Sequence, residues 1–180
     1  MNLKDAILNR RSIKIFGEST IDVDVVKQAI NSAIYAPNHG VREPWHIKYV
    51  QKEQLEQYAE QIGDIAFKGD EQKKRNHASK LSMLGGILVV SVDRDVRQKQ
   101  HHENLMAGGA FMQNLMLLLH AEAVGTCWHT PGYMFTPEYY QMMNISSDQE
   151  IIAELYLMDV NDDNSSERSN GYDDIVETWG

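Results

Sequence analysis

Three cations and a hydroxyl lie close together near the start of the chain, at Arg10, Arg11, Ser12 and Lys14. Guanidinium groups and a serine hydroxyl can all donate hydrogen bonds to one phosphate, and positive charge strengthens those bonds. The whole protein has a formal net charge of -9, so this basic cluster is a local exception. The cluster therefore suits a phosphate. On local features alone, a solvated basic helix end is the simpler interpretation, because cations complement the helix dipole there.

Other reactive residues give weaker signals. No glycine-rich phosphate loop follows a strand, and no GxSxG nucleophile elbow is present. His101 and His102 are adjacent, so on a helix they would point about 100° apart and could not easily share a metal ion. Cys127 lies in an apolar segment, where a thiol is usually inert. His39 lies in a loop between two prolines, which suits contact with a ligand. Because the adjacent histidines cannot easily share an ion, we expect no metal site.

The amino-acid composition limits the classes of protein to which the chain can belong. The chain has 180 residues, 42% hydrophobic and 24% charged, which indicates one globular domain. Its 26 acidic residues against 17 Lys and Arg argue against a general nucleic-acid or anionic-membrane surface. A single cysteine excludes an intrachain disulfide, no signal peptide is visible, and the apolar runs are too short to span a bilayer. We expect a cytoplasmic protein.

Hydrophobic periodicity predicts the elements that must position these side chains. Helical spacing occurs over residues 3–9, 23–36, 53–66, 71–84, 101–123 and 137–143. Apolar runs with β-branched or alternating residues predict strands over 45–50, 87–92, 125–129 and 151–158. Residues 159–170 lose hydrophobicity and are expected to form an extended loop. The alternation of helices and strands predicts an α+β or α/β layered fold with a central sheet.

The helix expected over 101–123 is apolar on nearly all sides. A helix of that kind is buried, either in the domain core or between subunits. Its run of Ala107, Gly108, Gly109 and Ala110 would let another backbone approach closely. We therefore expect part of this helix to meet a second subunit. A late apolar set, Tyr172 to Trp179, is expected to dock as well.

Three ordered blocks resemble the FMN-dependent nitroreductases. Residues 10–16 resemble the RRSxRxF signature of that family. Residues 36–39, followed after five residues by Trp45, are similar to its APSxxNxQPW block, and Gly125 to Gly132 is similar to its third block. Residues 172–176 are similar to its closing segment. Each block alone is weak, whereas three in register are fairly specific.

The resemblance implies an α+β nitroreductase-like fold, with a central mixed sheet flanked by helices in an intertwined homodimer. It implies a single domain over residues 1–180, with residues 160–180 as a C-terminal arm on the partner subunit. FMN would lie at the dimer interface. By position, Arg10, Arg11 and Ser12 would hold its phosphate and ribityl chain. Lys14 would add a cation and Arg168 a further phosphate contact.

The other implied contacts lie farther along the chain. Tyr35 and His39 would reach the flavin of the other subunit. Trp128, His129 and Thr130 would line the isoalloxazine and phosphate side. His39 and His129 are the candidate proton donors, because imidazole exchanges protons near neutral pH. The block around His39 departs from the family pattern, so the resemblance leaves the substrate class open.

The implied function is an FMN oxidoreductase that takes hydride from NADH or NADPH. It would reduce a nitroaromatic, quinone or similar small acceptor by a ping-pong mechanism. Two alternatives from other classes stay open. In one, the protein binds FMN as a sensor, storage or flavin-modifying protein without oxidising NAD(P)H. In the other, it is a non-flavin interaction protein whose basic cluster only caps a helix.

Overall fold

Four strands form one sheet in the order β1-β2-β4-β3 in the computed structural model, which describes residues 1–160 and 168–179. The strands are β1 (Trp45–Gln51), β2 (Gly86–Asp93), β3 (Val124–His129) and β4 (Gln149–Asp159). All three pairings between them are antiparallel. We expected a mixed sheet. Parallel pairing occurs in the described ranges only as an isolated bridge between Ser12 and Thr126 of β3.

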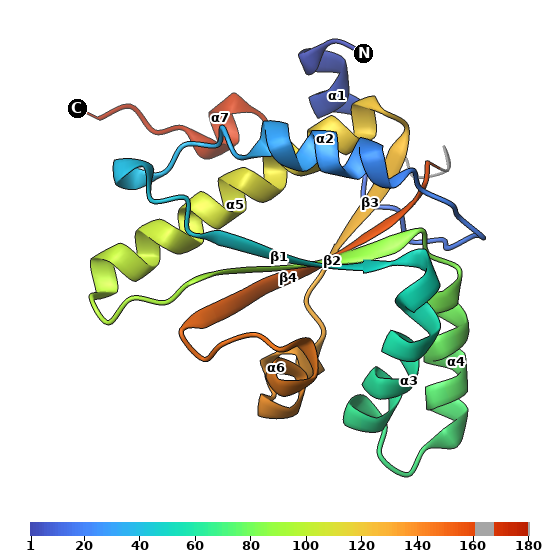
Figure 1. Ribbon diagram of the computed structural model, residues 1–180. Coiled ribbons are helices and arrows are strands. Elements are labelled where there is room, and N and C mark those ends of the chain that lie inside the picture. Colours follow the sequence, from blue (N-terminus) through green and yellow to red (C-terminus); the bar gives the residue numbers. More distant parts are fainter. Residues whose placement is uncertain (161–167, 180) are drawn as a thin grey trace.

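Helices cover both faces of the sheet, as Figure 1 shows. On one face lie α2 (Val23–Ala33) and α5 (Gln98–Ala121), with α1 (Leu3–Asn9) against α5. On the other lie α3 (Leu55–Ala66), α4 (Glu71–Ser82) and α6 (Pro137–Met143). Every helix expected up to residue 143 is confirmed, although α2 ends three residues early. Within residues 1–160 and 168–179, none of the helices is long and apolar enough to cross a membrane.

Two apolar layers follow from the alternation of side chains along the central strands. Leu88 on β2 and Leu155 on β4 are fully buried and pack with Phe111 of α5. Ile87 and Tyr156, one residue away on the same two strands, pack in the opposite layer with α3 and α6. Both faces of β2 and β4 are therefore covered, which explains why these strands are almost continuously apolar in sequence.

The segment after α1 docks on the outer edge of β3. The backbone N–H of Ile13 donates to the carbonyl oxygen of Thr126 at 3.0 Å, and the Ile13 side chain is 3% exposed. Gly125 makes this approach feasible. A Cβ there would lie 2.9 Å from Cγ1 of Ile13 and 3.0 and 3.1 Å from the carbonyl oxygens of Asp159 and Met158. This docking fixes the basic cluster beside β3.

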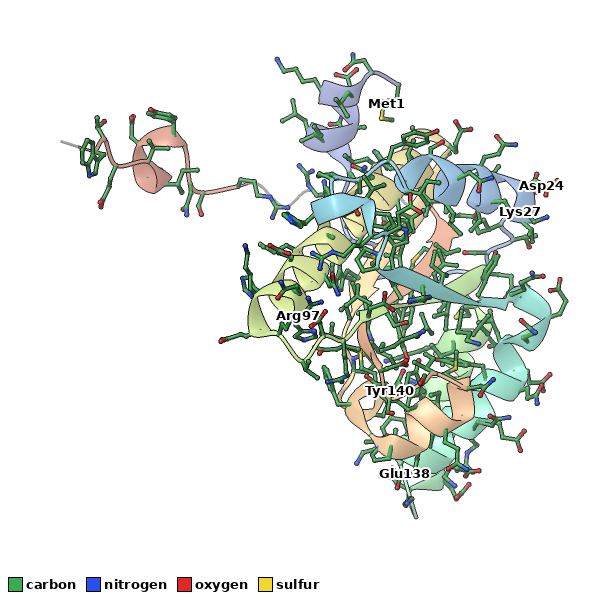
Figure 2. All side chains as sticks on the ribbon, turned by 60° about the vertical axis from the view of Figure 1, so that its left-hand side comes forward. Met1, Asp24, Lys27, Arg97, Glu138 and Tyr140 are labelled. Atoms are coloured by element: carbon green, nitrogen blue, oxygen red, sulfur yellow. The ribbon has the colours of Figure 1, made fainter. Side chains whose placement is uncertain are left out.

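The end of the chain contributes α7 (Tyr172–Ile175) and an apolar tail. The loop expected over residues 159–170 falls largely on residues 161–167, which lie outside the described part of the chain. Tyr172 and Ile175 are each 72% exposed and Trp179 is 99% exposed. Figure 2 shows α7 and the residues after it projecting away from the body. Residues 168–179 therefore leave large apolar side chains in solvent.

We predict that Gly125→Ala lowers the free energy of unfolding by about 1–3 kcal/mol, the usual cost of overpacking. The added methyl group would push against backbone oxygens of β4 that cannot rotate away. Urea unfolding measures the change. Gly17→Ala is the matched control, because a Cβ there would meet nothing within 4 Å. It should leave stability unchanged or raise it by up to about 1 kcal/mol. Equal effects of the two substitutions would contradict the docking described for Ile13.

Candidate functional site

Arg10 lies where α1 ends, and part of its guanidinium is left unpaired by the described residues. Its Nη1 is buried and has no hydrogen-bond partner among residues 1–160 and 168–179. Burial, and then the positive charges of Arg168 and Arg11, lower the pKa of Arg10, while Cys127 acts in the opposite direction. An arginine stays charged at neutral pH despite such a shift. Arg10 is therefore a half-buried cation held among other cations.

Arg11 combines two roles. Its Nη1 donates to the carbonyl oxygens of Leu8 at 2.5 Å and of Arg10 at 2.9 Å. The Leu8 contact satisfies a carbonyl of the last turn of α1, as a cation near a helix C-terminus does. The interpretation of the basic cluster as a helix end is thus correct for the Nη1 group of Arg11. The Nε of Arg11 is nevertheless buried without a partner, so a donor remains available.

No carboxylate neutralises this cluster within the described ranges. None of the ion pairs formed there includes Arg10, Arg11 or Lys14. Arg168 is exposed, and its charge acts on Arg10 although 158 residues separate them in the chain. Like charges held together in a partly buried site repel one another, and an anion relieves that repulsion.

Sequence reasoning missed two polar groups beside the cluster. His120 lies in the last turn of α5, and its Nε2 is buried without a partner. Burial, followed by the charges of Arg10 and Arg11, lowers the pKa of His120. Thr126 is 1% exposed, and its Oγ1 is also unpartnered. A threonine inside an apolar strand was a usable signal, whereas nothing in the sequence connects His120 to Arg10.

Ser12, Lys14 and Cys127 complete this edge of the molecule. Ser12 is half-buried and bridges to Thr126, and Lys14 is exposed. Burial raises the pKa of the Cys127 thiol, and the charges of Lys14 and Arg10 oppose that effect. The thiol therefore stays protonated at neutral pH.

Trp128, His129 and Thr130 lie at the end of β3, and they do not share one environment. Trp128 is 37% exposed and Thr130 is exposed. Neighbouring side chains on a strand point to opposite faces. The His129 ring accordingly lies in the layer of α3 and α6. It stacks on Tyr156 with ring centroids 4.9 Å apart and 27° between planes, and its Nδ1 is buried without a partner.

Tyr35 and His39 lie in the segment after α2, and His39 is far from the basic cluster of the same chain. Tyr35 is 86% exposed in the turn after α2. The Nδ1 of His39 is 4.0 Å from a carboxylate oxygen of Glu103, whose other oxygen accepts from Nη2 of Arg42 at 2.6 Å. Glu103 and His120 are 17 residues apart on α5, or about 25 Å along the helix axis. One chain therefore does not bring its own His39 to its own Arg10.

The arrangement suits binding of a phosphate dianion more than metal chemistry. In the part of the chain that the structure describes, no group of three or more His, Cys, Asp or Glu side chains could hold a metal ion. The cluster instead offers guanidinium donors from Arg10 and Arg11, an ammonium from Lys14 and a hydroxyl from Ser12. Such donors recognise phosphate oxygens by charge-assisted hydrogen bonds.

Residues 7–158 match the family model of the nitroreductases, described as Nitroreductase family. The chain belongs to the nitroreductase family. It is 29% identical to "Putative NAD(P)H nitroreductase YfhC" of Bacillus subtilis over 158 residues, which are 84% of this chain and 80% of that protein.

Solved structures share the nitroreductase fold. A nitroreductase-like family protein from Bacillus cereus superposes with a TM-score of 0.89 at 22% identity, over 99% of this chain and 96% of the other. The FMN and NADPH-dependent nitroreductase NfnB from Sphigopyxis sp. strain HMH gives a TM-score of 0.77 at 15% identity, over 100% of both chains. The expected α+β nitroreductase-like fold is thus confirmed.

We predict that inorganic phosphate stabilises this nitroreductase family member through Arg10. At about ten times its dissociation constant, phosphate should raise the free energy of unfolding by about 1.4 kcal/mol. Arg10→Met should remove most of that increment, because it removes the buried unpartnered donor. Arg75→Met is the control, since Arg75 is exposed on α4 and its Nη2 donates to Oε1 of Gln72. Thermal unfolding at constant ionic strength measures both. An undiminished phosphate effect in Arg10→Met would contradict the site.

Proposed function

We propose that this chain is an FMN-dependent oxidoreductase that takes hydride from NADH or NADPH and reduces a small acceptor, such as a nitroaromatic or a quinone, in a ping-pong cycle. The observation that carries the proposal is the buried, unpartnered Nη1 of Arg10 among cations with no carboxylate partner in the described ranges. Membership of the nitroreductase family supports it. So do the NAD(P)H nitroreductase name of the Bacillus subtilis relative and the FMN in the description of NfnB.

The residues present fit the phosphate end of FMN. In the proposal, Arg10, Arg11 and Arg168 neutralise the dianion, and Lys14 adds a further positive charge. Ser12 donates a hydroxyl hydrogen bond to the phosphate or the ribityl chain. The unpartnered groups of His120 and Thr126 lie beside these residues and are available to the same ligand. When bound, FMN would supply the redox chemistry by accepting hydride from the nicotinamide and passing it to the acceptor.

The ring end of the proposed site begins at the end of β3. Trp128 and Thr130 are exposed there and can line the isoalloxazine, and the His129 backbone lies between them. His39 and His129 are the proposed proton donors, because imidazole can donate a proton near neutral pH. His39 is exposed on its loop, whereas the His129 ring is stacked on Tyr156. Of the two, His39 therefore has the freer access to an acceptor.

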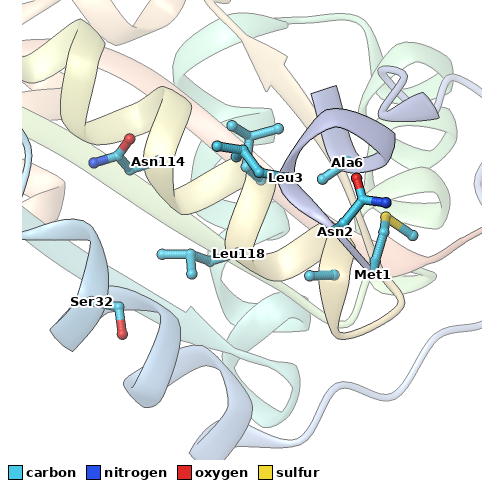
Figure 3. Close-up of a pocket in the computed structure, with 9 residues that line it drawn as sticks. Met1, Asn2, Leu3, Ala6, Ser32, Asn114 and Leu118 are labelled. Atoms are coloured by element: carbon cyan, nitrogen blue, oxygen red, sulfur yellow. The ribbon is translucent and has the colours of Figure 1, made fainter. Parts of the chain in front are cut away.

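The proposal includes a homodimer. Leu3 and Ile7 of α1 and Met106 of α5 are 68%, 53% and 57% exposed. A cavity of about 370 Å³ lies between α1, α2 and α5, and Leu3 is among the residues that line it (Figure 3). Exposed apolar side chains of this kind are typical of a subunit interface. A second copy would also let Tyr35 and His39 of one subunit serve the site of the other. The proposal keeps residues 160–180, of which 161–167 and 180 lie outside the described residues, as a C-terminal arm that docks on the partner subunit.

The two glycines of α5, Gly108 and Gly109, face different surroundings. A Cβ on Gly108 would lie 2.6 Å from Cγ1 of Val92 and 2.8 Å from Cδ1 of Ile152, so this glycine packs on the sheet. A Cβ on Gly109 would meet nothing within 4 Å in its own chain. Gly109 can therefore accept a close partner backbone.

We extend the proposal to a cytoplasmic location, because a chain with one cysteine needs no oxidising compartment for an internal disulfide.

We predict that the purified protein binds FMN and that its flavin absorption bleaches when NADH or NADPH is added without oxygen. Visible absorption spectra of the protein, before and after each nicotinamide, measure this. Arg10→Met should weaken FMN binding by about tenfold or more, the value of one lost charge-assisted contact. The control is again Arg75→Met, which should bind FMN as the wild type does.

Two results would redirect the proposal. Flavin that binds but is not reduced by either nicotinamide would favour a sensor, storage or flavin-modifying protein. A wild-type protein that fails to take up FMN would contradict the proposed cofactor, and the basic cluster would then be a helix end.

We predict that Met106→Glu weakens the dimer. A carboxylate placed without a partner in the proposed interface should cost about 3 kcal/mol, or a factor of roughly 100 in the dissociation constant. Sedimentation velocity over a dilution series measures it. Phe135→Glu is the matched control, because Phe135 is 63% exposed but follows β3 in the layer of α6. A monomeric wild type, or equal loss in both variants, would contradict this interface.

A further inference from the structure

A fully buried carboxylate lies in the layer opposite α5. Glu154 of β4 is 0% exposed, and none of the ion pairs formed by residues 1–160 and 168–179 includes it. Four phenols surround it. Tyr58 and Tyr139 donate to its Oε1 at 2.7 and 2.6 Å. Tyr133 and Tyr156 donate to its Oε2 at 2.9 and 3.1 Å.

The four phenols remain donors at physiological pH. Burial, and then the charge of Glu154, raise the pKa of Tyr58, Tyr133, Tyr139 and Tyr156. A buried carboxylate without a cation is costly unless hydrogen bonds satisfy its oxygens. Two phenol donors on each oxygen meet that requirement. Such a network holds its members in one geometry, because losing a donor leaves a buried charge less satisfied.

The tyrosines reach Glu154 from four different elements. Tyr58 belongs to α3, far in sequence from the end of β3, and Tyr139 belongs to α6, which follows η3 in the chain. Tyr133 belongs to the 3-10 helix η3 (Gly132–Phe135), which begins directly after residues 130–131. Tyr156 belongs to β4 and lies under the ring of His129.

One carboxylate therefore holds both ends of the turn formed by residues 129–133. At the first end, the His129 ring stacks on Tyr156, and His129 pairs directly with Glu154 across the strands. At the second end, the Tyr133 hydroxyl donates to Glu154. Between these anchors, Thr130 is exposed and Pro131 and Gly132 complete the turn. The position of this turn thus depends on a group on the far side of the sheet from α5.

We propose that Glu154 is a positioning residue for the flavin ring, acting through Tyr133 and Tyr156 on the turn of residues 129–133. This inference rests on the proposed function, in which the same turn lines the isoalloxazine. Glu154 touches neither cofactor nor acceptor. Its role is to fix Thr130 and the backbone on either side of it before the ring arrives, so that ordering the turn costs no binding free energy.

The test compares Tyr133→Phe with Tyr58→Phe in the full-length protein. Each substitution removes one O–H donor from the same carboxylate, but only Tyr133 is part of the turn. Tyr133→Phe should weaken FMN binding by about fivefold to tenfold, the value of about one net hydrogen bond. It should also change the visible circular dichroism of bound FMN. Tyr58→Phe should keep the wild-type affinity to within about twofold, although both variants lose stability to urea.

Riboflavin lacks the phosphate of FMN, so its binding reports the contacts to the flavin ring without those to the phosphate. Because the turn would meet the ring, Tyr133→Phe should weaken riboflavin binding by the same factor as FMN binding. Arg10→Met should weaken FMN binding only. If Tyr133→Phe fails to fold, Tyr156→Phe removes the donor at the other end of the turn and retains the aromatic ring under His129. It should give the same pattern.

The outcomes distinguish this inference from the proposed function. A wild type that binds no FMN overturns the proposed function, and the positioning role falls with it. A wild type that binds FMN, with Tyr133→Phe and Tyr58→Phe of equal affinity, overturns only the positioning role. Loss of FMN binding in Tyr133→Phe without loss of riboflavin binding also overturns it.

Discussion

The pairing of residues 12–13 with the edge of β3 is the contact on which the candidate site depends. It consists of one bridge to Thr126 and the burial of Ile13, and Gly125 leaves the space for it. The contact holds the guanidinium of Arg10 against the protein surface. Exposed carboxylates of the described residues that lie farther away than about 8–10 Å are largely screened by salt and do not neutralise that charge. A short backbone contact thus holds, in an acidic protein, a positive site that has no carboxylate partner among the described residues.

The cationic cluster and the buried carboxylate of Glu154 lie beside the same two strands, β3 and β4. The cations gather at the edge of β3, while Glu154 is buried in the layer of α3 and α6 beneath β4. The cations of the cluster are half-buried or exposed, and the proposed ligand would bind there. The carboxylate is closed off by four phenols, so it can only hold structure in place.

Periodicity was sufficient to predict most helices and strands, because each of them buries one regular set of apolar residues, whereas the nitroreductase-like fold was implied by the resemblance of three sequence blocks. Strands β2 and β4 and helix α5 were found within three residues of their ends for that reason. Arg10 and Arg11 could be selected because their charge contrasts with the chain around them. His120 and the tyrosines could not be selected. They meet Arg10 and Glu154 only through tertiary packing, and residues such as Tyr58 and Glu154 are separated by 96 positions.

Arg11 links α1 to the cationic cluster, since its Nη1 donates to the carbonyl oxygen of Leu8, and its Nε is buried with no partner among the described residues. Movement of α1 therefore displaces a charge of the cluster. Binding equilibria linked in this way are reciprocal. In the proposed site, whatever restrains α1 would strengthen the binding of an anion, and a bound anion would restrain α1 by the same free energy. The exposed leucine and isoleucine side chains of α1 would thus be energetically connected to the occupancy of that site.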